Sequence, residues 1–234
     1  MVKIVKEKIF TFWEGNMPEY IKLCMKTWGI DYIVLNFENL SEYTNIPMKN
    51  INKFTLPQIA DVVRVHVLRD QGGYWLDTDT ILISNELPKE NMIGHPNTRA
   101  NTIGYLHTKP NTDMYIKWAE YQDAILKKPI VINNWSIMGN DFTDSYVKEH
   151  KEISICSVRN CWAETYMITD NITRSEKYRK FYFARSYQLS DLKPTNMLML
   201  HNSWTPNYIK DLSEDELRHL DCTLSNILNE LVPV

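Results

Sequence analysis

Two aspartates separated by one residue, Asp77 and Asp79, stand near the end of the segment GGYWLDTDT, residues 72–80. In an extended backbone, side chains at i and i+2 point the same way, so these carboxylates would face each other and repel. A cation between them would remove that repulsion. Paired carboxylates form a hard, all-oxygen site that suits Mg²⁺ or Mn²⁺ better than zinc. The pair therefore predicts a divalent-cation site, whose open positions the oxygens of a diphosphate would fill. Taken alone, such a pair is also typical of a solvated turn.

A second pair of charged residues, Asp61 and Arg64, precedes the aspartates. The surrounding residues 56–70 have the pattern of a helix, in which i and i+3 share one face. An exposed ion pair is the alternative interpretation, and such pairs contribute little to stability. Asp61 and Arg64 are therefore candidate site residues only in combination with the aspartate pair.

The composition is that of an ordinary globular protein. The chain has 234 residues, of which 44% are hydrophobic and 24% charged, and its net charge is -3. Nothing indicates the basic stripe of a nucleic-acid-binding protein. The N-terminal residues are too charged for a signal peptide, and no apolar run reaches the length of about 20 residues that spans a bilayer. We therefore expect a cytoplasmic protein, and peripheral contact with the inner face of a membrane stays open.

The four cysteines form no C-x-x-C pair. Cys156 and Cys161 are conceivable metal ligands, although no histidine pattern accompanies them. Buried free thiols in a reducing compartment are the simpler interpretation.

The first half of the chain alternates strand and helix patterns, which is typical of an α/β fold. We expect strands at 8–13, 31–37, 76–83, 130–135, 153–158 and 197–204, and helices at 17–28, 56–70 and 115–127. The strand at 31–37 is almost continuously apolar, so we expect it to be buried on both faces. Thr55, Pro57 and Gly72 or Gly73 are the signals that begin and end the helix at 56–70.

The C-terminal region begins with a capping box, Ser213-x-x-Glu216, and continues with an apolar stripe. We expect this stripe to pack into the core; a helix lying on a membrane is the alternative. The sequence shows no repeat and no linker. A single domain over residues 1–234 is the simplest organisation, with a nucleotide-sugar half at about 1–85 and an acceptor and closing half at about 86–234.

The stretch IADVVRVHVLRDQGGYWLDTDT, residues 59–80, resembles the sugar-binding region of DXD glycosyltransferases of the GT-A type. The resemblance is to the capsular-polysaccharide and mannosyltransferase-like group, glycosyltransferase family 32, which is related to the catalytic domain of the large clostridial glucosylating toxins. The pattern in this group is A-S/A-D-x-x-R, about eight residues, then G-G-x-Y-x-D-x-D. Three flanking segments are also similar: the opening strand at 8–13, IMGNDFT at 137–143 with Asn140 where proline is usual, and LHNSW at 200–204.

The resemblance implies a Rossmann-like, mixed and mainly parallel sheet flanked by helices, and a role for each matching residue. Asp77 and Asp79 would hold Mn²⁺ or Mg²⁺ against the diphosphate of a UDP-sugar, with His201 as a third metal ligand. Asp61 and Arg64 would bind the transferred sugar, and Asp77 would also approach sugar or ribose hydroxyls. The remaining donor-binding residues implied are Trp13, which would stack on the base, and Ser203 and Trp204, which would meet the departing phosphate.

The implied activity is metal-dependent transfer of a hexose or N-acetylhexosamine from a UDP-sugar to a saccharide or lipid-linked saccharide acceptor, in bacterial capsule or surface polysaccharide synthesis. The family implies retention of anomeric configuration. Front-face transfer is the expected route, and a double displacement with Asp61 as nucleophile stays open. Two other classes also remain at this stage: a metal-dependent nucleotidyltransferase or phosphodiesterase, and a non-enzymatic sugar-nucleotide-binding protein. No nucleic acid partner is expected, and the oligomeric state is left open.

Overall fold

The computed structural model describes residues 7–84, 86–95, 100–128, 134–157 and 161–233. The chain forms two compact units that interleave along the sequence. Unit 1 comprises Met1–Gly15, Asp31–Asp77 and Lys89–Ser157, and unit 2 comprises Asn16–Ile30, Thr78–Pro88 and Val158–Val234. The single domain with halves at 1–85 and 86–234 stays a prediction.

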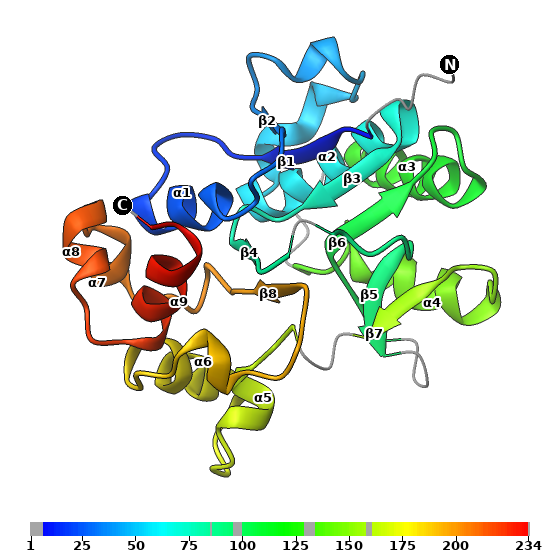
Figure 1. The fold of residues 1–234 in the computed structure, drawn as a ribbon. Coiled ribbons are helices and arrows are strands. Elements are labelled where there is room, and N and C mark those ends of the chain that lie inside the picture. Colours follow the sequence, from blue (N-terminus) through cyan, green and yellow to red (C-terminus); the bar gives the residue numbers. More distant parts are fainter. Residues whose placement is uncertain (1–6, 85, 96–99, 129–133, 158–160, 234) are drawn as a thin grey trace, which may run out of the picture. The chain divides into compact units, whose positions relative to one another are not determined.

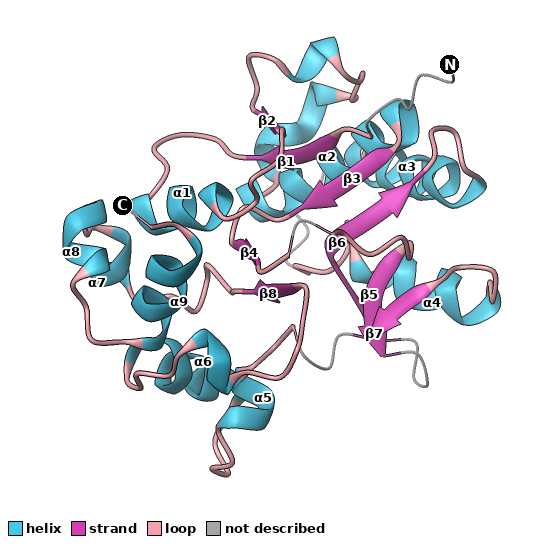
Figure 2. Ribbon diagram, viewed as in Figure 1, coloured by secondary structure: helices cyan, strands magenta, loops and turns pink. Residues whose placement is uncertain are grey.

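Unit 1 is built on a mixed six-stranded sheet, as expected for the α/β class. Its strand order is β2-β1-β3-β6-β5-β7, and the strands lie side by side in Figure 2. β1 is parallel to β2 and β3, and β5 is parallel to β7, whereas β6 is antiparallel to β3 and β5. The strand bounds are β1 Ile9–Phe12, β2 Ile33–Leu35, β3 Gly73–Leu76, β5 Met92–His95, β6 Ala100–Thr108 and β7 Ile155–Ser157.

The helix α2, Leu56–Gln71, packs against β1, β3 and the helix α3, Asp113–Leu126 (Figure 1). It begins where the sequence predicts, because Thr55 and Gln58 form a capping box and Pro57 lies in the first turn. It ends at Gly72, whose φ is 65°. The core beneath it is apolar and includes Phe10, Val62, Val65, Trp75, Leu106 and Trp118. The remaining helices of unit 1 are η1 Leu40–Glu42, η2 Met48–Lys53 and α4 Asn140–Glu149.

The expected strand through the two aspartates is wrong. β3 ends at Leu76, residues 77–79 form a turn, and β4, Thr80–Leu82, begins a different sheet. Asp77 is the last residue of its segment of unit 1, and Thr78 is the first of its segment of unit 2. The strands have different partners: β3 pairs with β1 and β6, and β4 pairs with β8, Met197–Met199. The alternation of an extended backbone therefore does not orient the aspartates.

Two further expectations need correction. β2 is an edge strand, and Ile33 and Val34 are only half-buried, so the apolar run at 31–37 is not covered on both faces. Of the strand expected at 130–135, residues 130–133 lie outside the described residues, and Asn134 and Trp135 are not in a strand. Apolar character alone therefore overestimated how much of the chain lies inside the sheet.

Unit 2 combines the β4–β8 pair with short helices. Trp28 donates from Nε1 to the carbonyl oxygen of Thr80 at 2.7 Å, and the N–H of Leu82 donates to Thr27 Oγ1 at 2.9 Å. Through these bonds, Thr27 and Trp28, which follow α1, are attached to β4. The helices are α1 Glu19–Lys26, α5 Glu164–Met167, α6 Arg174–Phe183, η3 Leu189–Asp191, α7 Asn207–Lys210, α8 Glu214–Arg218 and α9 Thr223–Leu231.

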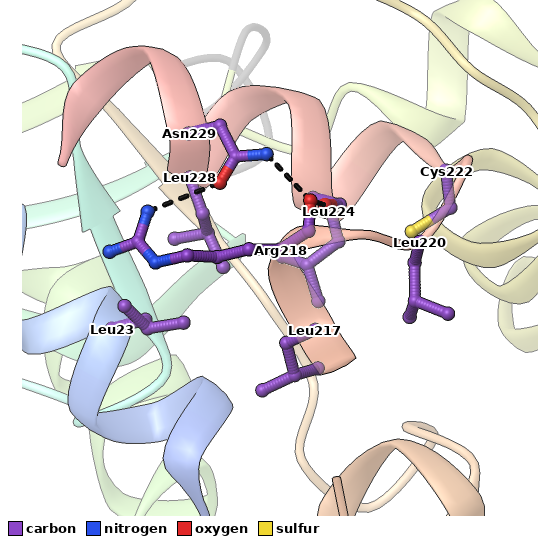
Figure 3. A pocket seen from close by; sticks show the side chains of 9 residues that line it. Leu23, Leu217, Arg218, Leu220, Cys222, Leu224, Leu228 and Asn229 are labelled. Atoms are coloured by element: carbon purple, nitrogen blue, oxygen red, sulfur yellow. Dashed lines mark hydrogen bonds between the residues drawn. The ribbon is translucent and has the colours of Figure 1, made fainter. Parts of the chain in front are cut away.

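The C-terminal apolar stripe packs inside unit 2, as expected, but it is carried by two helices, α8 and α9. Figure 3 shows Leu217, Leu224 and Leu228 facing Leu23 of α1 across a hollow too narrow to admit water. Arg218 ties the two helices together by donating from Nη1 to Asn229 Oδ1 at 3.1 Å. Across the described ranges, no helix has both the length and the apolar character that crossing a bilayer requires.

Three cysteines, Cys24, Cys161 and Cys222, are buried free thiols, which confirms that interpretation for them. The side chain of Cys156 lies outside the described residues.

We predict that Gly73→Ala destabilises the protein more than Gly15→Ala. Both glycines have positive φ, +88° and +82°, so alanine would cost about 1–2 kcal/mol at either position. A Cβ at Gly73 would also lie 2.3 Å from the carbonyl oxygen of Lys8, whereas a Cβ at Gly15 would meet nothing within 4 Å. Chemical denaturation should show that Gly73→Ala loses at least ~2 kcal/mol more. Equal losses would contradict the close approach of β1 and β3.

Candidate active site

Asp77 is held at the carboxyl end of β3 by three hydrogen-bonding groups. Its N–H donates to the carbonyl oxygen of Gly104 at 2.9 Å. Its Oδ1 accepts from Trp75 Nε1 at 2.8 Å and pairs with Arg64 Nη2 at 3.2 Å. The side chain is 36% exposed. One carboxylate oxygen is therefore fixed by the protein, and the side chain keeps access to solvent.

Asp61 and Arg64 lie on one face of α2, as their spacing predicts, and form an ion pair. Arg64 Nη2 is 3.0 Å from Asp61 Oδ1 as well as 3.2 Å from Asp77 Oδ1. The guanidinium also lies 5.2 Å from the ring centroid of Trp75. The structure thus brings together Asp61, Arg64 and Asp77 around one buried cation, which we call the Arg64 cluster.

Most of the hydrogen-bonding capacity of Arg64 is used inside unit 1. A guanidinium has five N–H groups. Nη1 donates to the carbonyl oxygen of Ile103 and Nε to the carbonyl oxygen of Ala60 at 3.4 Å, and Nη2 lies within ion-pair distance of both aspartates, so all three nitrogens meet groups of the protein. With its side chain 6% exposed, Arg64 is built to orient the two carboxylates.

Asp61 is a buried carboxyl group whose Oδ2 lies close to the backbone of Gly139. Burial raises the pKa of Asp61 to about 7; Arg64 opposes this rise and Asp77 adds to it. A Cβ on Gly139 would lie 3.1 Å from Asp61 Oδ2 and 2.3 Å from Ile103 Cδ1. The segment 137–143 that resembles a family motif therefore places a glycine where a side chain would crowd this oxygen.

The segment around Gly139 is anchored to α3. The carbonyl oxygen of Met138 accepts from Trp118 Nε1 at 3.0 Å and from Gln122 Nε2 at 2.6 Å. Gln122 Nε2 also lies 2.9 Å from the carbonyl oxygen of Asp61. These bonds fix the distance between α2 and the glycine, so the space beside Asp61 is part of the folded core.

Asp79 belongs to unit 2, where it is bonded to the segment after β8. Its Oδ2 accepts from the N–H of Asn202 at 2.8 Å, and its carbonyl oxygen accepts from the N–H of Leu200 at 3.0 Å. The side chain of Asn202 is itself bonded to the buried hydroxyl of Tyr20. The structure therefore links Asp79 to the 200–204 segment that the sequence singles out.

His201, the residue next to Asn202, is hydrogen-bonded to a cationic side chain of the protein, Arg174. Its Nε2 lies 3.1 Å from Arg174 Nη2. Because arginine only donates, Nε2 is the acceptor and the ring is neutral. Burial lowers the pKa of His201 to about 3, and the nearby Arg174 lowers it as well. In this arrangement Nε2 is not available to a metal ion. The role of His201 as a metal ligand stays a prediction.

Ser203 and Trp204 complete the turn after β8. Ser203 is exposed, and Trp204 is half-buried against His201, with ring centroids 4.0 Å apart. The N–H of Trp204 donates to the carbonyl oxygen of His201 at 2.9 Å, and its own carbonyl oxygen accepts from Arg179 Nε at 3.0 Å. The serine hydroxyl thus faces solvent, and the indole is packed.

Trp13 lies directly after β1 and is half-buried. Its N–H donates to the carbonyl oxygen of Leu35 at 3.0 Å, which extends the β1–β2 pairing by one residue. Its Nε1 is buried and, within the described part of the chain, has no hydrogen-bond partner. A buried indole N–H usually finds an acceptor, so this one has capacity for another group.

The donor set partly fits a hard divalent cation. Asp77 and Asp79 offer carboxylate oxygens of the kind that Mn²⁺ and Mg²⁺ prefer. In the ranges that the structure describes, no group of three or more His, Cys, Asp and Glu side chains is placed to hold a metal ion. Oxygens of a bound ligand would therefore have to complete the coordination.

The comparisons with known proteins identify the family. A family described as "Capsular polysaccharide synthesis protein" matches residues 2–214. The chain belongs to this family. A solved structure described as "PaToxG Glycosyltransferase" is similar with a TM-score of 0.47 and 13% identity, over 96% of this chain and 86% of that one. The search of curated proteins gives no match.

Three residues that the sequence motifs did not single out contact the candidate site residues. Trp75 binds Asp77, Gly139 borders Asp61, and Arg174 binds His201. Trp75 lies inside the GGYWLDTDT segment and Gly139 inside the 137–143 segment, so the motifs could have indicated both residues. Arg174 has no such signal, because it lies 27 residues from His201.

We predict that Asp61→Asn changes how stability depends on pH. The folded protein keeps the Asp61 proton up to about pH 7, whereas an unfolded aspartate loses it near pH 3.9. The folded state therefore binds more protons between these values, and the free energy of unfolding falls as pH rises. Urea titrations in metal-free buffer should show the Asn variant gaining about 2–4 kcal/mol relative to wild type between pH 4 and pH 8.

The matched control is Asp113→Asn. Asp113 is paired with Lys117 and Tyr146, which lower its pKa, the opposite direction to the shift at Asp61. This variant should follow wild type across the same range. A stability gap between Asp61→Asn and wild type that does not move with pH would show that Asp61 is ionised throughout.

Proposed function

We propose that this protein is a metal-dependent glycosyltransferase that moves a hexose or N-acetylhexosamine from a UDP-sugar to a saccharide acceptor during capsular polysaccharide synthesis. One observation carries the proposal: Arg64 binds Asp61 at 3.0 Å and Asp77 at 3.2 Å, at the carboxyl end of a strand in an α/β sheet. Ligands of open α/β sheets bind at such strand ends. Membership of the capsular polysaccharide synthesis family supports the same reaction class.

In the proposal, Asp77 and Asp79 hold a divalent cation, Mn²⁺ or Mg²⁺, together with the diphosphate of the donor. Only Thr78 separates them, so their Cα atoms lie within about 7 Å of each other. The bound cation would neutralise charge that develops on the leaving diphosphate. The protein's part is orientation: Arg64 and Trp75 fix Asp77 Oδ1, and the N–H of Asn202 fixes Asp79 Oδ2.

Asp61 is proposed to bind hydroxyls of the transferred sugar through Oδ2, the oxygen beside Gly139. Its raised pKa leaves part of the group protonated near neutral pH, and the ionised form is held by Arg64, so Asp61 is poorly placed to act as a nucleophile. We therefore propose retention of configuration by front-face transfer rather than by double displacement. The remaining donor contacts proposed are Trp13 on the base and Ser203 and Trp204 at the phosphates.

The acceptor is proposed to be a saccharide or a lipid-linked saccharide. A lipid-linked acceptor would bring the protein to the inner face of a membrane, so peripheral contact belongs to the same proposal. Equilibrium binding to vesicles with and without a glycolipid acceptor tests it.

We predict that Asp77→Asn and Asp79→Asn each lower Mn²⁺-dependent turnover by at least about 100-fold, the range seen when one electrostatic group of a catalytic site is removed. The amide is isosteric and keeps one coordinating oxygen, so raised Mn²⁺ should restore part of the activity. The exposed Asp211→Asn is the control for loss of one charge. Near-normal turnover of both variants at low Mn²⁺ would show that Asp77 and Asp79 do not hold the cation.

We predict that UDP-hexoses or UDP-N-acetylhexosamines are the donors, and that slow hydrolysis without acceptor releases UDP and free sugar. A panel of nucleotide sugars, with products resolved by chromatography, tests both statements. Release of UMP and sugar phosphate would identify a phosphodiesterase or nucleotidyltransferase. Binding of UDP-sugars without any product would identify a binding protein, and metal-dependent use of GDP-mannose alone would refute the uridine donor.

A further inference from the structure

Arg174 lies among a buried glutamate and three partly buried rings in unit 2. It is the first residue of α6, which packs against α5 (Figure 1). Its Nε lies 3.3 Å from Oε1 of Glu164, whose side chain is 0% exposed. The guanidinium carbon lies 3.9 Å from the ring centroid of Trp162 and 5.5 Å from that of Trp204. The side chain is thus fixed from several directions.

Unlike Arg64, all three of whose guanidinium nitrogens meet groups of the protein, Arg174 uses only Nε and Nη2 within the described part of the chain. One N–H group on Nε meets Glu164, and one on Nη2 meets His201 Nε2 at 3.1 Å. Within the part of the chain that the structure describes, the other three of its five N–H groups have no acceptor. The side chain is 38% exposed, so a ligand can reach it.

The contacts of Arg174 resemble a prepared anion site more than a simple neutralisation of Glu164. The buried Glu164 meets one N–H group, on Nε, through Oε1, and its Oε2 has no hydrogen-bond partner among the described residues, so pairing with Glu164 leaves the rest of the guanidinium open. Stacking on Trp162 and the bond to His201 hold the guanidinium plane in one orientation. A planar guanidinium with parallel free N–H groups binds phosphate oxygens in a bidentate manner.

The position of Arg174 ties it to the proposed donor site. His201, which binds Arg174, is followed by Asn202, whose N–H binds Asp79 Oδ2 at 2.8 Å. The proposed cation-binding aspartate and the open guanidinium are therefore attached to adjacent residues of one turn. A diphosphate has enough oxygens to meet both a cation at Asp79 and the guanidinium.

We propose that Arg174 binds the diphosphate of the nucleotide donor, and that Glu164, Trp162 and His201 are the residues that position it. This inference rests on the proposed function. It gives His201 a different role from the metal ligand that the sequence suggests: its Nε2 accepts from Arg174 and holds the guanidinium in place.

The test is calorimetric binding of UDP and inorganic pyrophosphate with Mn²⁺, and ligand-observed NMR for uridine. Arg174→Gln should weaken UDP and pyrophosphate roughly 10- to 100-fold, as expected for loss of charge-assisted hydrogen bonds, and leave uridine unchanged. Arg174→Lys keeps the charge without the fork and should fall between. Lys177→Gln removes one positive charge from the same helix and should bind as wild type.

Loss of Arg174 would leave Glu164 buried without its partner. The second variant is therefore the double substitution Arg174→Gln/Glu164→Gln, which should lose as much affinity for UDP and pyrophosphate as Arg174→Gln. Glu164→Gln alone should keep most of it. Unchanged UDP binding in both Arg174 variants, or equal losses for UDP and uridine, would overturn the inference. If wild type binds pyrophosphate through Arg174 but does not bind UDP, the anion site at Arg174 is supported and the proposal of a UDP-sugar donor is wrong. If wild type binds neither, both proposals fail.

Discussion

The Arg64 cluster depends on one buried cation shared by two carboxylates. Removing either carboxylate would leave the guanidinium short of one partner, and removing the arginine would leave Asp61 buried without compensation, which is strongly destabilising in proteins. Asp61 and Asp77 come from a helix and from a strand end, so the cation also sets where α2 lies on the sheet at this point. The geometry of the site and the packing of unit 1 are therefore one constraint.

The two arginines show how burial decides what the same side chain can do. Arg64 is 6% exposed and all three of its guanidinium nitrogens meet groups of the protein, so it orients other residues. Arg174 is 38% exposed and uses two of the three. Both are held by a carboxylate and lie beside an aromatic ring. The difference is the number of donors left, which a motif cannot show because it records only residue types.

The parts of the fold that could be predicted are those with local causes. Thr55, Gln58 and Gly72 set the ends of α2, and the spacing of Asp61 and Arg64 places them together on it. The turn at 77–79 has no local cause, because the alternation of WLDTDTIL suits a strand throughout. It arises because β3 and β4 pair with strands far away in the chain. β2 was misjudged for a similar reason: an apolar run does not reveal that a strand has a neighbour on only one side.

The same distinction explains which site residues the sequence could assign. Asp61 and Arg64 match a pattern whose residues are near in the chain, and their contact follows from helix geometry. The role of Arg64 does not follow, because it depends on Ile103 and Asp77, which other elements supply. Since those contacts consume its donors, the free oxygen of Asp61 is the group of this pair that can accept a hydroxyl. A side chain at Gly139 would lie against that oxygen, so recognition of a sugar here would depend as much on an absent side chain as on the charged ones.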